Sequence, residues 1–307
     1  MLISFIKNCA TYFILFLLYL LHFFPLCILR FCGKMLGGFL FYVVLPRKKV
    51  VLKNLELCFP SLSESQRKIL AKKHFQAFAC AVLDRTLGWW ASPKRLTKIL
   101  KLGGEGVADL ENAIQQKQPI VVLAPHFIGL DAAGTILSMK YHFSSMFSNQ
   151  KNEILNKVLY NGRMRFHEPV LMSRQDGLRK IVKTLKQGIP FYYLPDMDFG
   201  RKESIFVPFF GIATATTPAL VRLCQMTKAK VIPCITRQIA DGYEITLEKA
   251  WENFPSENAD KDTLLYENTV AMNKYIESKI LTMPEQYFWL HKRFKTRPEG
   301  EESFYKK

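Results

Sequence analysis

The sequence predicts an α/β protein with a mixed, mostly parallel sheet flanked by helices and an apolar N-terminal helix. From residue 118 onward, short β-prone runs alternate with segments of helical periodicity, which is the pattern of an α/β sandwich. Hydrophobic residues make up 49% of the 307 residues, enough for a substantial core. One uncharged run near the N-terminus is long enough to cross a membrane.

Residues 8–29 form this uncharged run, and a helix of that length spans the roughly 30 Å of hydrocarbon in a bilayer. A cleaved signal peptide is the alternative, but its apolar region is usually shorter and ends in a small-residue cleavage site. Only Lys7 precedes the run, whereas Arg30, Lys34 and the basic residues of 47–53 follow it. By the positive-inside rule, the bulk of the chain faces the cytoplasm.

A second uncharged run, 35–46, is too short to span, and we expect it to lie in the membrane interface or to pack against the main domain. The sequence 47–60 is a basic connecting segment that ends in a turn. The expected organisation is an anchor over 1–34, an interfacial and basic connector over 35–60, and the main domain over 61–307.

The main domain opens with a capping-box pattern, Ser63 followed by Gln66, and apolar residues of helical period come after it. Later elements are predicted from β-prone runs, apolar periodicity and Gly or Pro boundaries. The predicted strands are 120–124, 142–147, 191–194, 231–237 and 243–247. The predicted helices are 61–93, 131–139, 152–166, 176–186 and 217–228.

The charge balance points to an anionic partner, since 43 Lys and Arg face 26 Asp and Glu, a formal charge of +17. Nucleic acid, an acidic membrane surface and an acidic carrier all fit this charge. The seven cysteines contain no CxxC pair, which argues against a disulfide framework or a zinc site. The six histidines show no close ligand spacing, so we predict no metal site.

The candidate chemistry begins at His126, which follows the predicted strand 120–124 and precedes Asp131 by five residues. Both side chains are expected at the mouth of the sheet, where α/β folds bind ligands. A His held by an Asp is a common general base near neutral pH. The structural alternative is that His126 ends the strand and Asp131 caps the next helix, and an isolated H-x4-D motif does not decide between these.

Four further segments accompany this motif: Tyr-Asn-Gly-Arg-Met-Arg at 160–165, Pro-Asp-Met-Asp-Phe-Gly at 195–200, Val-Pro-Phe-Phe-Gly at 207–211, and the block 284–298. In this order they resemble the late acyltransferases of lipid A biosynthesis, the lauroyl/myristoyl transferase family of Gram-negative bacteria. The resemblance covers nearly the whole chain. One departure is Met197, where the family often has Gln between the two Asp residues.

The resemblance implies a glycerolipid-acyltransferase-like fold in a single-pass protein of the bacterial inner membrane, with its catalytic domain on the cytoplasmic face. It implies transfer of an acyl chain from an acyl carrier protein thioester to a hydroxyl of a hydroxyacyl chain on a Kdo-bearing lipid A precursor. No further cofactor is implied. His126 matches the family's base and Asp131 its acidic partner, while Arg163 and Asp196 match further residues needed for activity.

On this view, His126 takes the proton of the acceptor alcohol while Asp131 holds the ring. Arg163 is expected to stabilise the oxyanion or, with Arg165, to bind the anionic head group. The structural alternative is a solvated helix face or an ion pair with Asp196. Asp198 is expected either to stabilise its turn or to take part in catalysis.

The C-terminal block is expected to be mixed, with Trp289 in the core. His291, Lys292, Arg293, Lys295 and Arg297 are expected to be solvated or to contact acidic lipid or the carrier. The run 207–211 is expected to pack in the core or to line an acyl groove.

The main alternative function is a glycerol-phosphate or lysophospholipid acyltransferase that uses acyl-CoA, since those enzymes share H-x4-D. The block 289–295, which resembles the lipid A family, disfavours it. A non-catalytic lipid-binding protein is disfavoured because His126, Asp131, Arg163 and Asp196 are all present. A nucleic-acid-binding protein fits the charge but not the membrane helix.

Overall fold

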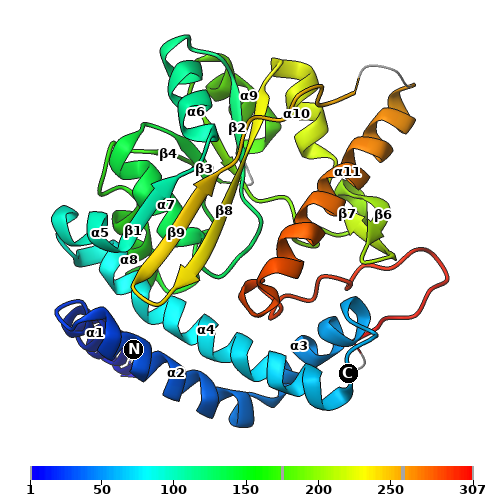
Figure 1. Ribbon diagram of the computed structural model, residues 1–307. Coiled ribbons are helices and arrows are strands. Elements are labelled where there is room, and N and C mark those ends of the chain that lie inside the picture. The colour runs from blue at the N-terminus through cyan, green and yellow to red at the C-terminus, as the bar shows by residue number, and fades with distance from the viewer. Residues whose placement is uncertain (1, 174–175, 257–259, 306–307) are drawn as a thin grey trace.

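A computed structural model describes residues 2–173, 176–256 and 260–305, and its centre is one seven-stranded sheet (Figure 1). All neighbouring strands run parallel except β8 and β9, so the predicted mixed, mostly parallel sheet is confirmed. In spatial order the strands are β1 (Leu100–Gly103), β9 (Gly242–Leu247), β8 (Lys230–Ile239), β2 (Ile120–Leu123), β5 (Phe191–Tyr193), β3 (Ser144–Met146) and β4 (Val170–Met172).

Both faces of this sheet are covered by a hydrophobic cluster, and the central strands β8, β2 and β5 contribute to both clusters because their side chains alternate between the faces. In β2, Val121 and Leu123 join one hydrophobic cluster, whereas Ile120 and Val122 join the other. The helices that follow the N-terminal region are α4 (Glu64–Trp90), α5 (Pro93–Ile99), α6 (Gly106–Gln115), α7 (Leu130–Lys140), α8 (Glu153–Arg163), α9 (Gly177–Lys186), α10 (Ala219–Thr227) and α11 (Lys261–Thr282).

The predicted strands and helices of the main domain all have a counterpart within a few residues. The capping box is present: the backbone N–H of Ser63 donates to Gln66 Oε1 at 2.8 Å, and the backbone N–H of Gln66 donates to Ser63 Oγ at 3.2 Å. Elements β1, β4, α5, α6 and α11 lie where the sequence gave no separate prediction.

The N-terminal region differs from its prediction, because 8–29 is not one helix. Helix α1 (Leu2–Leu21) ends before a turn, and α2 (Leu26–Val43) begins after Pro25. Proline lacks the N–H that a continuing helix needs and disfavours helical backbone in the residue before it. By length and composition, α2 is the one described helix that could cross a membrane. The basic segment that follows is also helical, as α3 (Leu45–Cys58).

Helix α2 packs lengthwise against α4, which confirms that the run 35–46 contacts the main domain (Figure 1). Two glycines bring the helices together. A Cβ at Gly37 would lie 2.3 Å from the Phe75 carbonyl oxygen, and one at Gly33 would lie 2.7 Å from Cys80 Cα. Only a residue without a side chain permits this approach.

The run 207–211 belongs to a hairpin of β6 (Ile205–Phe209) and β7 (Ile212–Thr216), in which Phe209 is fully buried. Arg293 and Arg297 hold this hairpin: Arg293 Nη1 donates to Ala215 O at 2.7 Å, and Arg297 Nη1 donates to Ala213 O at 2.6 Å. Both arginines are buried, so the expectation that they are solvated or face an acidic partner is wrong. Trp289 lies in the core, as predicted.

Candidate active site

His126 and Asp196 follow two neighbouring strands at the same offset. Strands β2 and β5 are parallel, with Leu123 paired to Tyr193, and the backbone N–H of Ala124 extends the ladder by donating to Tyr193 O at 2.8 Å. A proline comes next on each strand, and then His126 on one and Asp196 on the other. The two side chains therefore meet at the carboxyl edge of the sheet, where such folds place their ligands.

Asp196 holds His126 by two hydrogen bonds. The ring Nδ1–H donates to Asp196 Oδ1 at 2.7 Å, and the backbone N–H of His126 donates to Asp196 Oδ2 at 2.9 Å. The Asp196 carboxylate is buried, whereas 16% of the His126 side chain is exposed. This arrangement fixes the tautomer and leaves Nε2 as the ring nitrogen that can accept a proton.

The C-terminal segment closes the other side of this pair. The backbone N–H of Phe288 donates to His126 O at 2.9 Å, and that of Ile128 donates to Gln286 O at 2.8 Å. Between these two bonds, the hydroxyl of buried Tyr287 donates to Asp196. Tyr287 was not among the predicted site residues, although it lies within the block 284–298 that carried the resemblance.

The electrostatics keep Asp196 ionised. Burial raises the pKa of its carboxyl, but the charge of His126 and the hydrogen bonds from His126 and Tyr287 outweigh burial, so the pKa lies below its usual value. Burial and the neighbouring Asp196 raise the pKa of Tyr287, which therefore remains a hydroxyl donor at neutral pH.

Asp131 does not hold the imidazole, so the predicted pairing of His126 with Asp131 is wrong. Its carboxylate instead forms ion pairs with Arg85 of α4, at 2.6 Å, and Arg163 of α8, at 3.3 Å. The reason is positional: Asp131 lies in the first turn of α7, beside α4 and α8, whereas the neighbouring strand delivers Asp196 to the ring. Arg85 was missed because nothing distinguishes it within the predicted helix 61–93.

The pKa of the Asp131 carboxyl lies below its usual value, because the charges of Arg85 and Arg163 outweigh the effect of desolvation. Arg163 also donates from Nη1 to Met146 O at 3.3 Å and lies over the Phe147 ring. Its ion-pair partner is thus Asp131 and not Asp196. With 38% of its side chain exposed, Arg163 keeps N–H donors available to a ligand.

Arg165 is not brought to this site. Its Nη1 donates to Gly88 O at 2.6 Å and its Nη2 to Ala91 O at 2.8 Å. These are carbonyls at the C-terminal end of α4, which lack partners within the helix. Arg165 therefore caps the C-terminal end of α4 and does not make the predicted contact with substrate.

Asp198 stabilises its turn, one of the two roles predicted for it. Its carboxylate accepts the backbone N–H of Thr296 at 2.7 Å and the Thr296 hydroxyl at 2.8 Å. Its own backbone N–H donates to His291 Nε2 at 2.9 Å. Burial and the charge of Arg293 lower the pKa of His291 to about 4, so His291 is a neutral acceptor here and not a solvated cation.

Two other features of the described residues bear on ligand binding. No group of three His, Cys, Asp or Glu side chains converges there in a way that could hold a metal ion. A hollow of about 1080 Å³ lies around the start of β8, lined by Lys230, Trp251 and Phe254 among others. Lys230 is at the opposite end of the sheet from His126, so this hollow is separate from the His126–Asp196 pair.

Comparison with known proteins gives a consistent result. The sequence profile of a family described as bacterial lipid A biosynthesis acyltransferase matches residues 3–296. The chain is 32% identical over 286 residues to the lipid A biosynthesis palmitoleoyltransferase of Escherichia coli, covering 92% of this chain and 89% of that protein. It is 33% identical over 279 residues to the lauroyltransferase of the same organism, with 89% and 87% covered. An acyltransferase of Haemophilus influenzae is 30% identical over 281 residues, with 90% and 86% covered.

Proposed function

Because the chain belongs to the bacterial lipid A biosynthesis acyltransferase family and is therefore an acyltransferase, we propose the identity of its substrates and the residues that act on them. The donor is an acyl chain held as a thioester on acyl carrier protein. The acceptor is a hydroxyl of a hydroxyacyl chain on a Kdo-bearing lipid A precursor. The observation that carries the chemistry is the buried carboxylate of Asp196 bonded to His126, whose other ring nitrogen is free to face a substrate.

His126 acts as the general base. Its Nε2 takes the proton of the acceptor hydroxyl while the hydroxyl oxygen forms a bond to the thioester carbonyl carbon. The tetrahedral intermediate then collapses, the C–S bond breaks, and the thiolate of the carrier takes the proton back from the imidazolium. General base catalysis of this kind contributes about 10²–10⁴-fold.

Asp196 orients the ring and stabilises the imidazolium that forms, the part that sequence reasoning gave to Asp131. Asp131 instead positions Arg163, together with Arg85. We assign to Arg163 the binding of an anionic group of the acceptor, because a planar guanidinium suits bidentate contact with phosphate.

The protein acts on the cytoplasmic face of the bacterial inner membrane. The apolar helices at the N-terminus and the net charge of +17 both suit an acidic membrane surface and an acidic carrier. A single-pass anchor would have to be α2, the one described helix with the length and composition to cross. Whether it crosses or lies along the bilayer depends on its packing against α4.

The test is an acyl transfer assay with the full chain in detergent. Acyl carrier protein thioester and a Kdo-bearing lipid A precursor form one arm, and acyl-CoA with lysophosphatidate forms the other, with products identified by mass spectrometry. We expect transfer in the first arm, and transfer only in the second would overturn the assignment. His126→Ala should lower kcat by about 10²–10⁴-fold, while His142→Ala, an exposed histidine, should keep activity.

A further inference from the structure

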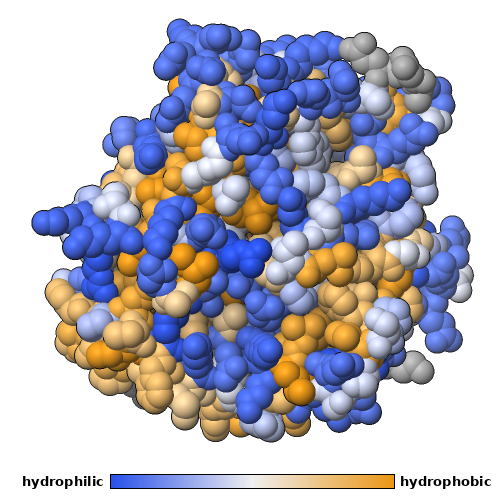
Figure 2. Space-filling view, viewed as in Figure 1, coloured by the Kyte–Doolittle hydropathy of each residue, from blue (hydrophilic) through white to orange (hydrophobic). Residues whose placement is uncertain are grey.

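The N-terminal helices carry an exposed apolar surface. Among the described residues, most exposed large apolar side chains lie between Tyr12 and Leu45. Figure 2 shows tan and orange side chains over the lower left of the molecule, where α1 and α2 lie in Figure 1. An apolar area of this kind on a folded chain marks an interaction site.

Helix α2 has two distinct faces. One face, which includes Arg30, Gly33, Gly37 and Phe41, is buried against the protein. The opposite face is an outward stripe formed by Ile28, Phe31, Met35, Phe39 and Tyr42, of which Phe31 is 67% exposed and Phe39 is 62% exposed. The spacing of three and four residues places these five side chains in one row.

The buried face is attached to α4 along nearly its whole length, and the two helices run antiparallel. Near its start, Arg30 Nη2 lies 3.1 Å from Asp84 Oδ2. In the middle, Gly33 and Gly37 approach the α4 backbone. Near its end, the Phe41 ring of α2 packs against the Phe75 ring of α4, with 5.8 Å between the ring centroids.

This attachment excludes a membrane crossing by α2 alone. Helix α4 would have to enter the hydrocarbon beside it, together with α7, α8 and the C-terminal segment that pack on α4, and α4 exposes Lys73. Charged side chains in the bilayer centre are strongly unfavourable.

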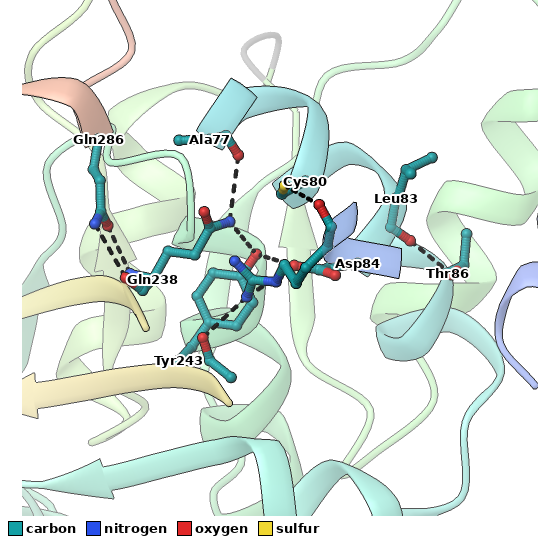
Figure 3. Close-up of polar contacts among 10 residues, drawn as sticks. Ala77, Cys80, Leu83, Asp84, Thr86, Gln238, Tyr243 and Gln286 are labelled. Atoms are coloured by element: carbon teal, nitrogen blue, oxygen red, sulfur yellow. Dashed lines mark hydrogen bonds and ion pairs between the residues drawn. The ribbon is translucent and has the colours of Figure 1, made fainter. Parts of the chain in front are cut away.

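A polar network fixes Arg30 in this position, and Figure 3 shows its members Asp84, Tyr243 and Gln238. Its guanidinium donates to Gly242 O at 3.0 Å, and the Tyr243 hydroxyl donates to the same Asp84 carboxylate at 2.7 Å. Gln238 Nε2 then donates to the Tyr243 hydroxyl at 3.1 Å. Arg30 is therefore committed to the protein interior, although it lies within an apolar helix.

Helix α1 is tied down in the same way. Asn152, the N-cap of α8, donates from Nδ2 to Thr11 Oγ1 at 2.9 Å. Arg95 of α5 donates to the carbonyls of His22 and Phe24 in the turn between α1 and α2. Both N-terminal helices thus lie on the side of the main domain, and α1 contacts the helix that carries Arg163.

Basic side chains border the apolar surface and identify what covers it. Lys34, Arg47 and Lys49 are exposed, and Lys48 lies over the Phe41 and Tyr42 rings. Aromatic and basic residues at the edge of an apolar surface are typical of the boundary between acyl chains and anionic head groups. The charge of this border is complementary to an acidic leaflet.

We propose that α1 and α2 form an in-plane membrane-docking surface, with the outward stripe of α2 immersed in one anionic leaflet and α2 parallel to the bilayer. This rests on the proposed membrane location and deepens it. Docking in this way would bring α8 and Arg163 close to the leaflet that contains the lipid acceptor.

The test measures depth in the membrane. Cys9, Cys27 and Cys32 are exposed and would be replaced by Ser, while the four buried cysteines remain. Single cysteines at Phe31, Met35 and Phe39, which span about 12 Å along the helix, would carry an environment-sensitive fluorophore. The full-length variants would be bound to vesicles of mixed anionic and zwitterionic phospholipid containing quenchers at shallow or deep positions.

We expect all three labels to be quenched best at the same shallow depth, about 5–10 Å below the surface. A label at Tyr266→Cys, exposed on α11, should stay in water and resist both quenchers. A steady progression in depth from residue 31 to residue 39 would overturn the proposal. Circular dichroism of each variant would verify folding, which these exposed positions should not disturb.

A second measurement addresses the charge. The double variant Lys48→Glu/Lys49→Glu should bind anionic vesicles at least tenfold more weakly at low salt, with little change on purely zwitterionic vesicles. If wild type and variant bound equally well to anionic and to zwitterionic vesicles, the assignment of an anionic leaflet as the partner would be contradicted. Neither measurement needs turnover. Failure to transfer an acyl chain to the expected acceptor would therefore not affect the docking result, and failure to dock in this way would not affect the transfer assay.

Discussion

The Nδ1 atom of His126 lies 2.7 Å from the carboxylate of Asp196, although 70 residues separate them in the chain. Each stands three residues beyond a paired position of two adjacent parallel strands, Leu123 and Tyr193. The His–carboxylate pair is thus built by the central sheet and not by the local H-x4-D motif.

Asp196→Asn should lower kcat by about 10²–10⁴-fold, because an amide cannot accept the imidazole N–H as a carboxylate does and the ring loses its tautomer. Asp131→Asn should leave kcat within severalfold and mainly raise KM for the lipid acceptor, since it loosens Arg163. Steady-state kinetics in detergent would measure both. A large loss of kcat in Asp131→Asn with near-normal Asp196→Asn would restore the pairing expected from sequence.

Tyr287→Phe should lower kcat by roughly tenfold, equivalent to about 1.4 kcal/mol, with KM for the acceptor unchanged. With one donor fewer, the Asp196 carboxylate interacts more strongly with the imidazole and favours its protonated form, so the acid limb of the pH–rate profile should move to higher pH. Tyr275→Phe is the matched control, because it removes a hydroxyl bonded to Glu248 at 2.8 Å, away from the site. An unaltered pH profile in Tyr287→Phe would show that the hydroxyl only fills space.

Two arginines that are two residues apart should behave differently. Arg165→Met should reduce the free energy of unfolding by about 1–3 kcal/mol, because two carbonyls at the end of α4 lose their donor. Its kcat and KM should match the wild type. Arg163→Met should instead raise KM for the anionic acceptor at least severalfold. Thermal unfolding and kinetics on both variants would test this, and a shared phenotype would contradict the separation of their roles.

The ion pairs of Asp131 should make stability depend on pH. A carboxyl whose pKa is lowered on folding stabilises the folded state above its ordinary pKa, about 3.9, and loses that contribution as the pH falls through the lower folded value. The difference in unfolding free energy between wild type and Asp131→Asn should therefore be constant above about pH 5 and shrink as the pH falls below about pH 4. Unfolding by urea at several pH values would measure it.

Asp84→Asn is the control of opposite sign. Burial raises the pKa of Asp84, and the Arg30 charge only partly offsets this. The carboxyl of Asp84 therefore favours folding most when it is protonated. The free energy of unfolding of the wild type should rise relative to that of Asp84→Asn as the pH falls. If the free energies of unfolding of Asp131→Asn and Asp84→Asn, each relative to the wild type, changed with pH in the same direction, the opposite pKa shifts assigned to the two carboxyls would be contradicted.

The adjacent glycines of α2 offer a matched pair. Gly37→Ala should lower the free energy of unfolding by about 1–3 kcal/mol, since its Cβ would lie 2.3 Å from Phe75 O. In Gly38→Ala the new Cβ has its nearest neighbour at 3.6 Å, so the variant should be neutral or up to about 1 kcal/mol more stable. Thermal unfolding of both would decide, and equal destabilisation would contradict close packing at Gly37.

Features with a local cause were predictable from the sequence. The capping box at Ser63, the β-prone run before His126 and the sheet strands after residue 190 follow from side-chain chemistry and period within a few residues. Pro25 also indicates a break in the N-terminal helix, but the prediction of one continuous helix gave more weight to the absence of charge in 8–29. Composition says which residues avoid water and does not say where the backbone turns.

The features that were missed depend on residues far apart in the chain. Asp196 is the partner of His126 because β5 lies beside β2, and strand order is not written in either segment. One signal was present: both predicted strands end in a Pro followed by a polar residue, Pro125-His126 and Pro195-Asp196. Arg293 reads as a solvated charge until the hairpin that presents its carbonyls is known.

Synthesis order gives the bonds between His126 and the segment 286–288 a further meaning. The ribosome delivers His126 early, Asp196 later, and Tyr287 close to the end of translation. A nascent chain therefore holds its imidazole without the residues that orient it, and the site is assembled only when nearly the whole chain has been made.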